Sequence, residues 1–147
     1  MQVLVTIRST STMDEDAQPI EVMCSGTVDQ QDGKVMLVYE EALTEGELFD
    51  TTLTAVNGEY AMLERSGPLT GTCMRIEQNK RHLCHYETGF GTMMLGLYGE
   101  QIHADVNANG GNIRLVYALD IDGESLGKNT VEISVRPKEM TCGAPLQ

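Results

Sequence analysis

The stretch NIRLVYALDID, residues 112–122, decides the fold class of this chain. An apolar residue stands at every second position from Ile113 to Ile121, and the residues between and after them include Arg114, Asp120 and Asp122. Successive side chains of a β-strand point to opposite faces of the sheet, so this alternation predicts a strand with one buried face.

The same period of two recurs on both sides of this stretch. Two further rows are Val3, Val5, Ile7 and Val35, Leu37, Tyr39. Asp-Gly and Asn-Gly pairs predict tight hairpin turns between such rows, because glycine tolerates the positive φ of a close reversal. The pairs stand at residues 32–33 and 57–58.

A third hairpin is predicted from Gly71–Gln78 to Arg81–Thr88 around Asn79-Lys80. Further strands are expected at residues 92–98, 101–106, 112–122 and 130–136. With turn signals every ~8–12 residues, about nine to eleven short strands are typical of a β-sandwich or β-barrel.

Successive hairpins without a long crossover favour the barrel over the sandwich. Closing such a meander removes the exposed sheet edges that promote aggregation. We therefore expect an all-β fold, a single antiparallel up-and-down barrel over residues 1–147 with its strands at about 2–136. Residues 137–147 are expected to form a loose C-terminal tail.

Charge and composition exclude several classes of partner. The 147 residues carry 22 acidic and 10 basic side chains, for a net charge of −12. Nucleic acids and anionic membranes bind through Lys and Arg, so neither is expected as a partner. The sequence shows no secretory signal, no long apolar run and no C-x-x-C pair, which predicts a cytoplasmic protein with reduced thiols.

Short motifs in order along the chain resemble those of the YwiB-like family of bacterial proteins. They are Arg65-Ser66-Gly67, then Lys80-Arg81-His82, then the segment from Tyr86 to Gly91, and finally the alternating strand 114–122. The resemblance spans nearly the whole chain. It implies a cytoplasmic calycin-like, lipocalin-like barrel and implies no activity, because the family has none assigned. Calycin relatives often hold a small apolar ligand inside, but such an analogy of fold transfers no ligand residue.

The third hairpin is the most polar part of the chain. With a two-residue loop, Glu77 would face His82, Arg75 would face Cys84, and Cys73 would face Tyr86. One face would then carry Cys73, Arg75, Glu77, His82, Cys84 and Tyr86, and the other face, with Met74, Ile76, Leu83 and His85, would be the better core face. Glu77 and His82 could act as an acid–base or anion-binding pair, or form an ordinary surface ion pair.

No metal or cofactor is expected. A structural zinc needs four ligands that converge on one point, and Arg75 opposite Cys84 would repel a cation. Phosphate-binding and dinucleotide-binding glycine motifs are absent, and so is the motif of a serine nucleophile. Arg65 is the residue least explained by turn geometry, and it could bind a ligand carboxylate, pair with Glu64 or Glu87, or remain solvated.

Three functions stay open at this stage. The first is a non-enzymatic binder of a small apolar or amphipathic ligand inside the barrel, with Arg65, Arg75, Glu77, His82, Tyr86 and Tyr117 as candidate binding residues. The second is an interaction or homodimer module with a filled barrel, whose apolar patch would include Val38, Leu53 or Leu95 if they face outward. The third is an enzyme that uses Glu77 and His82, and no catalytic residue is assigned with it.

Overall fold

One face of every strand in the protein turns toward a common interior. The computed structural model describes residues 1–12, 19–42, 48–66, 71–88 and 91–138. Its ten strands are β1 (Gln2–Ser11), β2 (Ile20–Gln31), β3 (Lys34–Ala42), β4 (Leu48–Val56), β5 (Tyr60–Ser66), β6 (Gly71–Glu77), β7 (Arg81–Thr88), β8 (Gly91–Asn107), β9 (Gly110–Ile121) and β10 (Glu124–Pro137).

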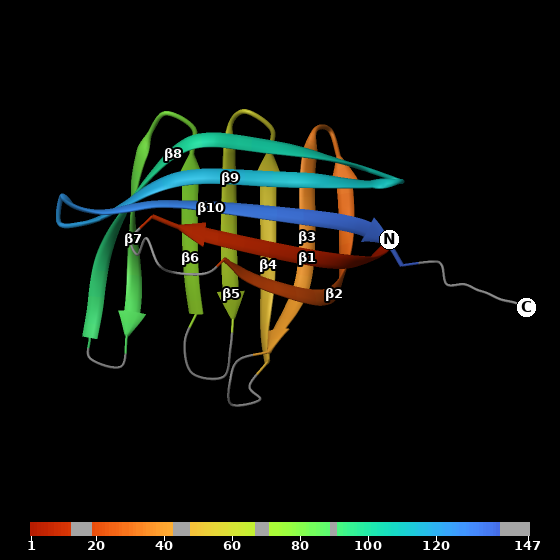
Figure 1. The fold of residues 1–147 in the computed structure, drawn as a ribbon, viewed down its shortest axis with the longest axis horizontal. Coiled ribbons are helices and arrows are strands. Elements are labelled where there is room, and N and C mark those ends of the chain that lie inside the picture. The colour runs from red at the N-terminus through yellow and green to blue at the C-terminus, as the bar shows by residue number, and fades with distance from the viewer. Residues whose placement is uncertain (13–18, 43–47, 67–70, 89–90, 139–147) are drawn as a thin grey trace, which may run out of the picture.

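The ten strands form one antiparallel sheet in the order β6-β5-β4-β3-β2-β1-β10-β9-β8-β7. Strands that are neighbours in sequence pair with each other, except β6 and β7, which stand at the two ends of this order. β1 also pairs with β10, from Val3 opposite Pro137 to Ser11 opposite Asn129. This pairing of the first and last strands bends the meander round until β6 and β7 meet (Figure 1). The prediction of an antiparallel up-and-down barrel with about nine to eleven strands is confirmed.

Two of the hairpins turn at Asp-Gly pairs. Asp32 and Gly33 have φ angles of 53° and 79°, and Asp122 and Gly123 have φ angles of 52° and 85°. Two consecutive residues with positive φ make the turn whose twist matches the two strands that it joins. The hairpin predicted at Asp32-Gly33 is confirmed, with Gln31 opposite Lys34.

The barrel has its seam between β6 and β7. These strands are bridged at the tip of their hairpin, where Glu77 lies opposite Lys80, and β6 then pairs with β5 while β7 pairs with β8. The predicted turn at Asn79-Lys80 and the predicted pairing of Arg75 with Cys84 are therefore wrong. The chain turns one residue earlier, at Gln78-Asn79, and the two strands then separate.

The core face of this hairpin was predicted correctly for β6 and wrongly for β7. Ile76 is 3% exposed and Met74 is half-buried, as expected. On β7, however, Cys84 is buried and Leu83 is 59% exposed. β7 does not continue its hydrogen bonds with β6, so its inward face is set by its pairing with β8. In that pairing, the fully buried Leu97 of β8 lies opposite His82.

Strand β8 closes one end of the barrel. The sequence suggested a break at Gly99, but the strand continues there through a β-bulge between Gly99 and Gln101. Beyond the bulge it crosses the tips of two hairpins. The amide of Gly58 donates to the carbonyl of Ile102 at 2.7 Å, and the amide of Ile102 donates to Gln78 Oε1 at 3.0 Å (Figure 1). A bulge bends its strand, which lets β8 lie over these tips.

Residue 99 has to be glycine for this end to close. The amide of Asn79 donates to the carbonyl of Gly99 at 2.8 Å, so the β6–β7 tip lies directly on β8. A Cβ at position 99 would stand 2.4 Å from the carbonyl oxygen of Glu77. The close approach of two backbones leaves no room for a side chain there.

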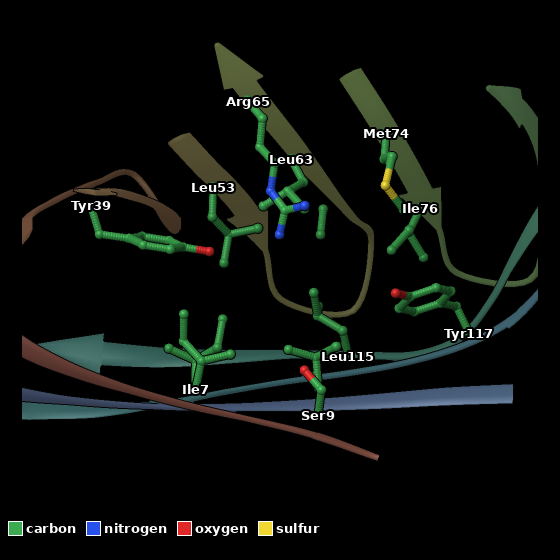
Figure 2. A pocket seen from close by; sticks show the side chains of 13 residues that line it. Ile7, Ser9, Tyr39, Leu53, Leu63, Arg65, Met74, Ile76, Leu115 and Tyr117 are labelled. Carbon is green, nitrogen blue, oxygen red and sulfur yellow. The ribbon is translucent and has the colours of Figure 1, made fainter. Parts of the chain in front are cut away.

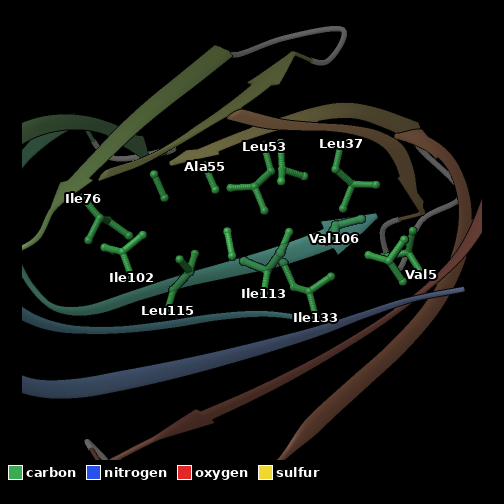
Figure 3. Close-up of a cluster of buried hydrophobic side chains, with 14 of the residues drawn as sticks. Val5, Leu37, Leu53, Ala55, Ile76, Ile102, Val106, Ile113, Leu115 and Ile133 are labelled. Atoms are coloured by element: carbon green, nitrogen blue, oxygen red, sulfur yellow. The ribbon is translucent and has the colours of Figure 1, made fainter. Parts of the chain in front are cut away.

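The hydrophobic core fills the interior at this closed end. Side chains from opposite walls of the barrel meet there (Figure 3). Leu37 and Leu53 come from one wall and Ile102 and Ile113 from the other, and all four are at most 2% exposed. The alternating row Ile113–Ile121 predicted from the sequence points inward, with its first three apolar residues buried.

Candidate functional site

The interior is hollow on the side away from the β8 crossing. A cavity of about 180 Å³ lies there among side chains from seven strands. Its lining, shown in Figure 2, comprises Ile7, Ser9, Tyr39, Leu53, Ala61, Leu63, Arg65, Met74, Ile76, Leu115, Tyr117, Val131 and Ile133.

The apolar part of the lining continues the core. Leu53, Ala61 and Leu115 are at most 5% exposed, and each stands on an inward row of its strand. Ala61 leaves space because its side chain ends at Cβ, and it lies opposite a second alanine, Ala55, on β4. The small side chain of Ala61 on the cavity wall is one structural reason why the barrel is hollow at this level.

The polar part of the lining converges on the middle of the cavity. Figure 2 shows the guanidinium of Arg65 reaching down from β5 while the hydroxyl groups of Tyr39 and Tyr117 turn toward it from opposite sides. Both tyrosines are buried, at 4% and 7% exposure. Arg65 is more exposed, because it stands next to the end of its strand.

A buried polar residue, Thr51, and a half-buried one, Asn129, flank these groups. Thr51 lies between Tyr39 and Arg65 in the strand register, and Asn129 lies opposite Tyr117. Asn129 Nδ2 donates to the Tyr117 hydroxyl at 3.4 Å. Within the described part of the chain, Thr51 Oγ1 and Asn129 Oδ1 are buried and have no hydrogen-bond partner.

Of the six candidate residues predicted from the sequence, two line this cavity, Arg65 and Tyr117. Three others gather at the β6–β7 hairpin instead. His82 Nε2 is 2.7 Å from Glu77 Oε1, and Arg75 lies 3.9 Å from the same oxygen, with its guanidinium 5.0 Å from the ring centre of Tyr60. The side chain of the sixth candidate, Tyr86, lies outside the described residues.

The hairpin cluster has the chemistry of a surface ion pair. The hydrogen bond from His82 lowers the pKa of the Glu77 carboxyl, with further help from the charges of Lys80 and Arg75. Such a pair could exchange protons with a bound molecule. Neither residue of the pair is among the described residues that line the cavity, so this cavity does not place a substrate against the pair.

The two cysteines on β6 and β7 differ in burial: Cys73 is exposed and Cys84 is buried. Burial raises the pKa of Cys84, and the nearby Cys73 raises it further. Cys84 Sγ donates to the carbonyl of Cys73 at 3.0 Å. Among the described residues, no three His, Cys, Asp or Glu side chains gather closely enough to hold a metal ion.

Sequence reasoning missed Tyr39, Thr51 and Asn129 as parts of this site. Tyr39 could have been found, because it ends the alternating row with Val35 and Leu37. Thr51 and Asn129 carry no such signal, since each becomes a neighbour of a cavity residue only through strand register.

Comparison with known proteins places the chain in a family. A family model described as a domain of unknown function, DUF1934, matches residues 5–133. The chain belongs to the DUF1934 family. Among solved structures, it is similar to the ywiB protein from Bacillus subtilis, with a TM-score of 0.76 and 20% sequence identity over 92% of this chain and 90% of that one. No curated protein matches the sequence.

The DUF1934 membership confirms the YwiB-like resemblance drawn from the sequence motifs. The structural likeness at 20% identity supports the fold alone. The wider relationship to calycin barrels stays a prediction. Among the described residues, no helical segment has the length and hydropathy of a membrane span.

Proposed function

We propose that this DUF1934 protein is a non-enzymatic binder of a small, mostly apolar molecule held inside the barrel. The observation that supports the proposal is the cavity of about 180 Å³, with an apolar floor and a few polar groups that converge on its middle. Ligand sites typically combine an apolar concave lining with a small number of placed polar groups. The proposed setting is the cytoplasm, which suits the three described cysteines, Cys24, Cys73 and Cys84, since none of them forms a disulfide.

The size of the cavity limits the ligand. Drug-sized ligands occupy about 300–1,000 Å³, whereas an apolar cavity of about 150 Å³ holds benzene. By that comparison the cavity has room for roughly seven non-hydrogen atoms. At about −0.3 to −1.5 kcal/mol per atom, such a ligand binds with about −2 to −10 kcal/mol, and dissociation constants near 0.1 mM fall inside that range.

The proposal is tested by an NMR titration of the ¹⁵N-labelled protein with pentan-1-ol, up to about 10 mM because small ligands bind weakly. We expect shifts concentrated at the amides of Leu53, Ala61 and Leu115, and their loss when Ala61→Leu fills the cavity. Val38→Ser, on the outer face, is the matched control and should leave the shifts unchanged. Shifts spread over the outer face, or none at all, would count against an interior site.

The outer surface gives less support to the alternative of an interaction or homodimer module. Of the three residues suggested for an outer patch, Val38 faces outward, Leu53 is fully buried and Leu95 is half-buried. Other apolar side chains are exposed on the outer face of β1–β3, notably Leu4, Met23 and Met36. In the register they are interrupted by the polar residues Ser25, Thr27 and Asp29. We therefore carry only the ligand-binding proposal forward.

A further inference from the structure

The charged side chain among the described residues that line the cavity has the opposite sign to the net charge of the protein. The chain carries a net charge of −12, with more than twice as many acidic as basic side chains. Among the described residues that line the cavity, however, the one charged side chain is Arg65, and no Asp or Glu lines it. A guanidinium above an apolar floor has enough N–H donors to bind an anionic group in addition to its contacts with the protein.

The neighbouring hydroxyl groups are placed to donate hydrogen bonds. Tyr39 and Tyr117 turn their hydroxyls toward Arg65 from opposite sides (Figure 2). The Tyr117 oxygen accepts a hydrogen bond from Asn129 Nδ2, which leaves its own O–H to donate to another acceptor. The cavity thus offers donors from three strands, and a ligand that accepts hydrogen bonds suits them.

The buried hydroxyl of Thr51 is a second, independent indication that a hydrogen-bond acceptor is missing beside the cavity. Its side chain is fully buried, and within the described chain its Oγ1 has no hydrogen-bond partner. It stands on β4 directly between Tyr39 and Arg65. Buried hydroxyls in native proteins nearly always have a partner, so an anion drawn between Tyr39 and Arg65 would supply one.

We propose that the ligand is a short-chain monocarboxylate, and this inference rests on the proposed interior binding. Its carboxylate contacts Arg65 and the hydroxyls of Tyr39 and Tyr117, and its hydrocarbon tail lies on Leu53 and Leu115. A guanidinium has five N–H donors in a planar fork, so it can give two of them to a carboxylate while it also contacts the protein. A cavity for roughly seven non-hydrogen atoms fits a chain of about five carbons.

The test compares pentanoate with pentanamide, which have the same number of non-hydrogen atoms and differ in charge. Both are titrated by NMR at pH 7 into the wild-type protein and into Arg65→Gln. We expect pentanoate to bind wild type about tenfold more tightly than pentanamide, since hydrogen bonds to charged groups are the stronger ones and Arg65 is partly solvated. Arg65→Gln should bring the ratio to about one by weakening pentanoate binding more than pentanamide binding, as glutamine keeps a polar side chain without the charge.

Three further variants make the result interpretable. Arg65→Lys should keep part of the preference for pentanoate, and Tyr117→Phe should reduce it by removing one donor. Arg75→Gln, an exposed arginine at the hairpin, is the matched control and should behave as wild type. If Arg65→Gln does not fold, the Arg65→Lys and Tyr117→Phe variants decide the question.

The outcomes separate this inference from the proposal beneath it. If neither ligand shifts the amides of the cavity residues, interior binding itself is wrong. If both ligands bind there with equal affinity, or if the preference for pentanoate survives Arg65→Gln and Tyr117→Phe, the cavity binds small molecules but the carboxylate inference is overturned.

Discussion

Replacing Ala61 with a larger residue tests whether the barrel is hollow. The substitution should stabilise the protein if the cavity exists and destabilise it if side chains already fill the interior. Ala61 is 1% exposed and lines the cavity, and its cross-strand neighbour Ala55 is fully buried and is not among the described lining residues. Replacing each in turn by leucine adds the same three carbon atoms to adjacent strands of the same wall.

The two substitutions are expected to change the free energy of unfolding in opposite directions. Filling existing space at position 61 contributes about 0.8 kcal/mol for each buried carbon, or about 2.4 kcal/mol. Ordering the leucine side chain costs about 0.5–1 kcal/mol, so Ala61→Leu should raise the free energy of unfolding by about 1.5 kcal/mol. Ala55→Leu instead forces a packed core apart and should lower it by about 1–3 kcal/mol.

Urea denaturation of both variants provides the measurement. With a slope near 2 kcal/mol per molar urea, typical of small proteins, the two midpoints should differ by about 1.3–2.3 M. Unchanged slopes would show that the variants differ in stability and not in compactness. If Ala61→Leu destabilises the protein as much as Ala55→Leu, the interior is filled by side chains and the reasoning is refuted.

The hairpin and seam give three further predictions. The hydrogen bond with His82 lowers the pKa of Glu77 in the folded protein below its ordinary value of 4.5. The ionised Glu77 therefore stabilises the fold above about pH 4.5, and this stabilisation is lost as the pH falls through the pKa of Glu77 in the folded protein. The stability difference between wild type and Glu77→Gln should therefore shrink below about pH 4.5, and a constant difference in acid melts would contradict this assignment. Cys73 should be alkylated by iodoacetamide well before Cys84, whose pKa is raised by burial, and equal rates in mass mapping would contradict it. Gly99→Ala should lower the free energy of unfolding by about 1–3 kcal/mol, because its Cβ would collide with the backbone of Glu77, and an unchanged urea midpoint would argue against that contact.

The strands and turns were predictable because their signals are local. The alternation from Ile113 to Ile121 follows from the period of a strand, and the Asp32-Gly33 turn follows from the tolerance of these residues for positive φ. The pairing of successive hairpins then led to the barrel, which needs in addition only the pairing of β1 with β10.

The β6–β7 hairpin could not be predicted because its geometry is set by a third strand. The turn is held on β8 by the hydrogen bonds of Asn79 with Gly99 and of Gln78 with Ile102. The pairing predicted from the sequence assumes that the two strands of a hairpin stay hydrogen-bonded beyond the turn. Here β6 pairs with β5 and β7 pairs with β8 instead. The exposure of Leu83 and the burial of Cys84 follow from that separation.

The candidate site was half predictable. Arg65 was conspicuous because turn geometry did not explain it, and Tyr117 stood on the clearest inward row. The cavity itself depends on side chains from seven strands and on the small Ala61, so no local pattern could reveal its volume. The hairpin cluster of Glu77 and His82 stood out for its polarity, although it lies elsewhere.

A crystal structure of the protein grown with pentanoate tests the central claim most directly. The account predicts ligand density inside the barrel, with the carboxylate within hydrogen-bonding distance of Arg65 and the tail against Leu53 and Leu115. An interior filled by side chains, or pentanoate bound only on the outer face of the sheet, would contradict it.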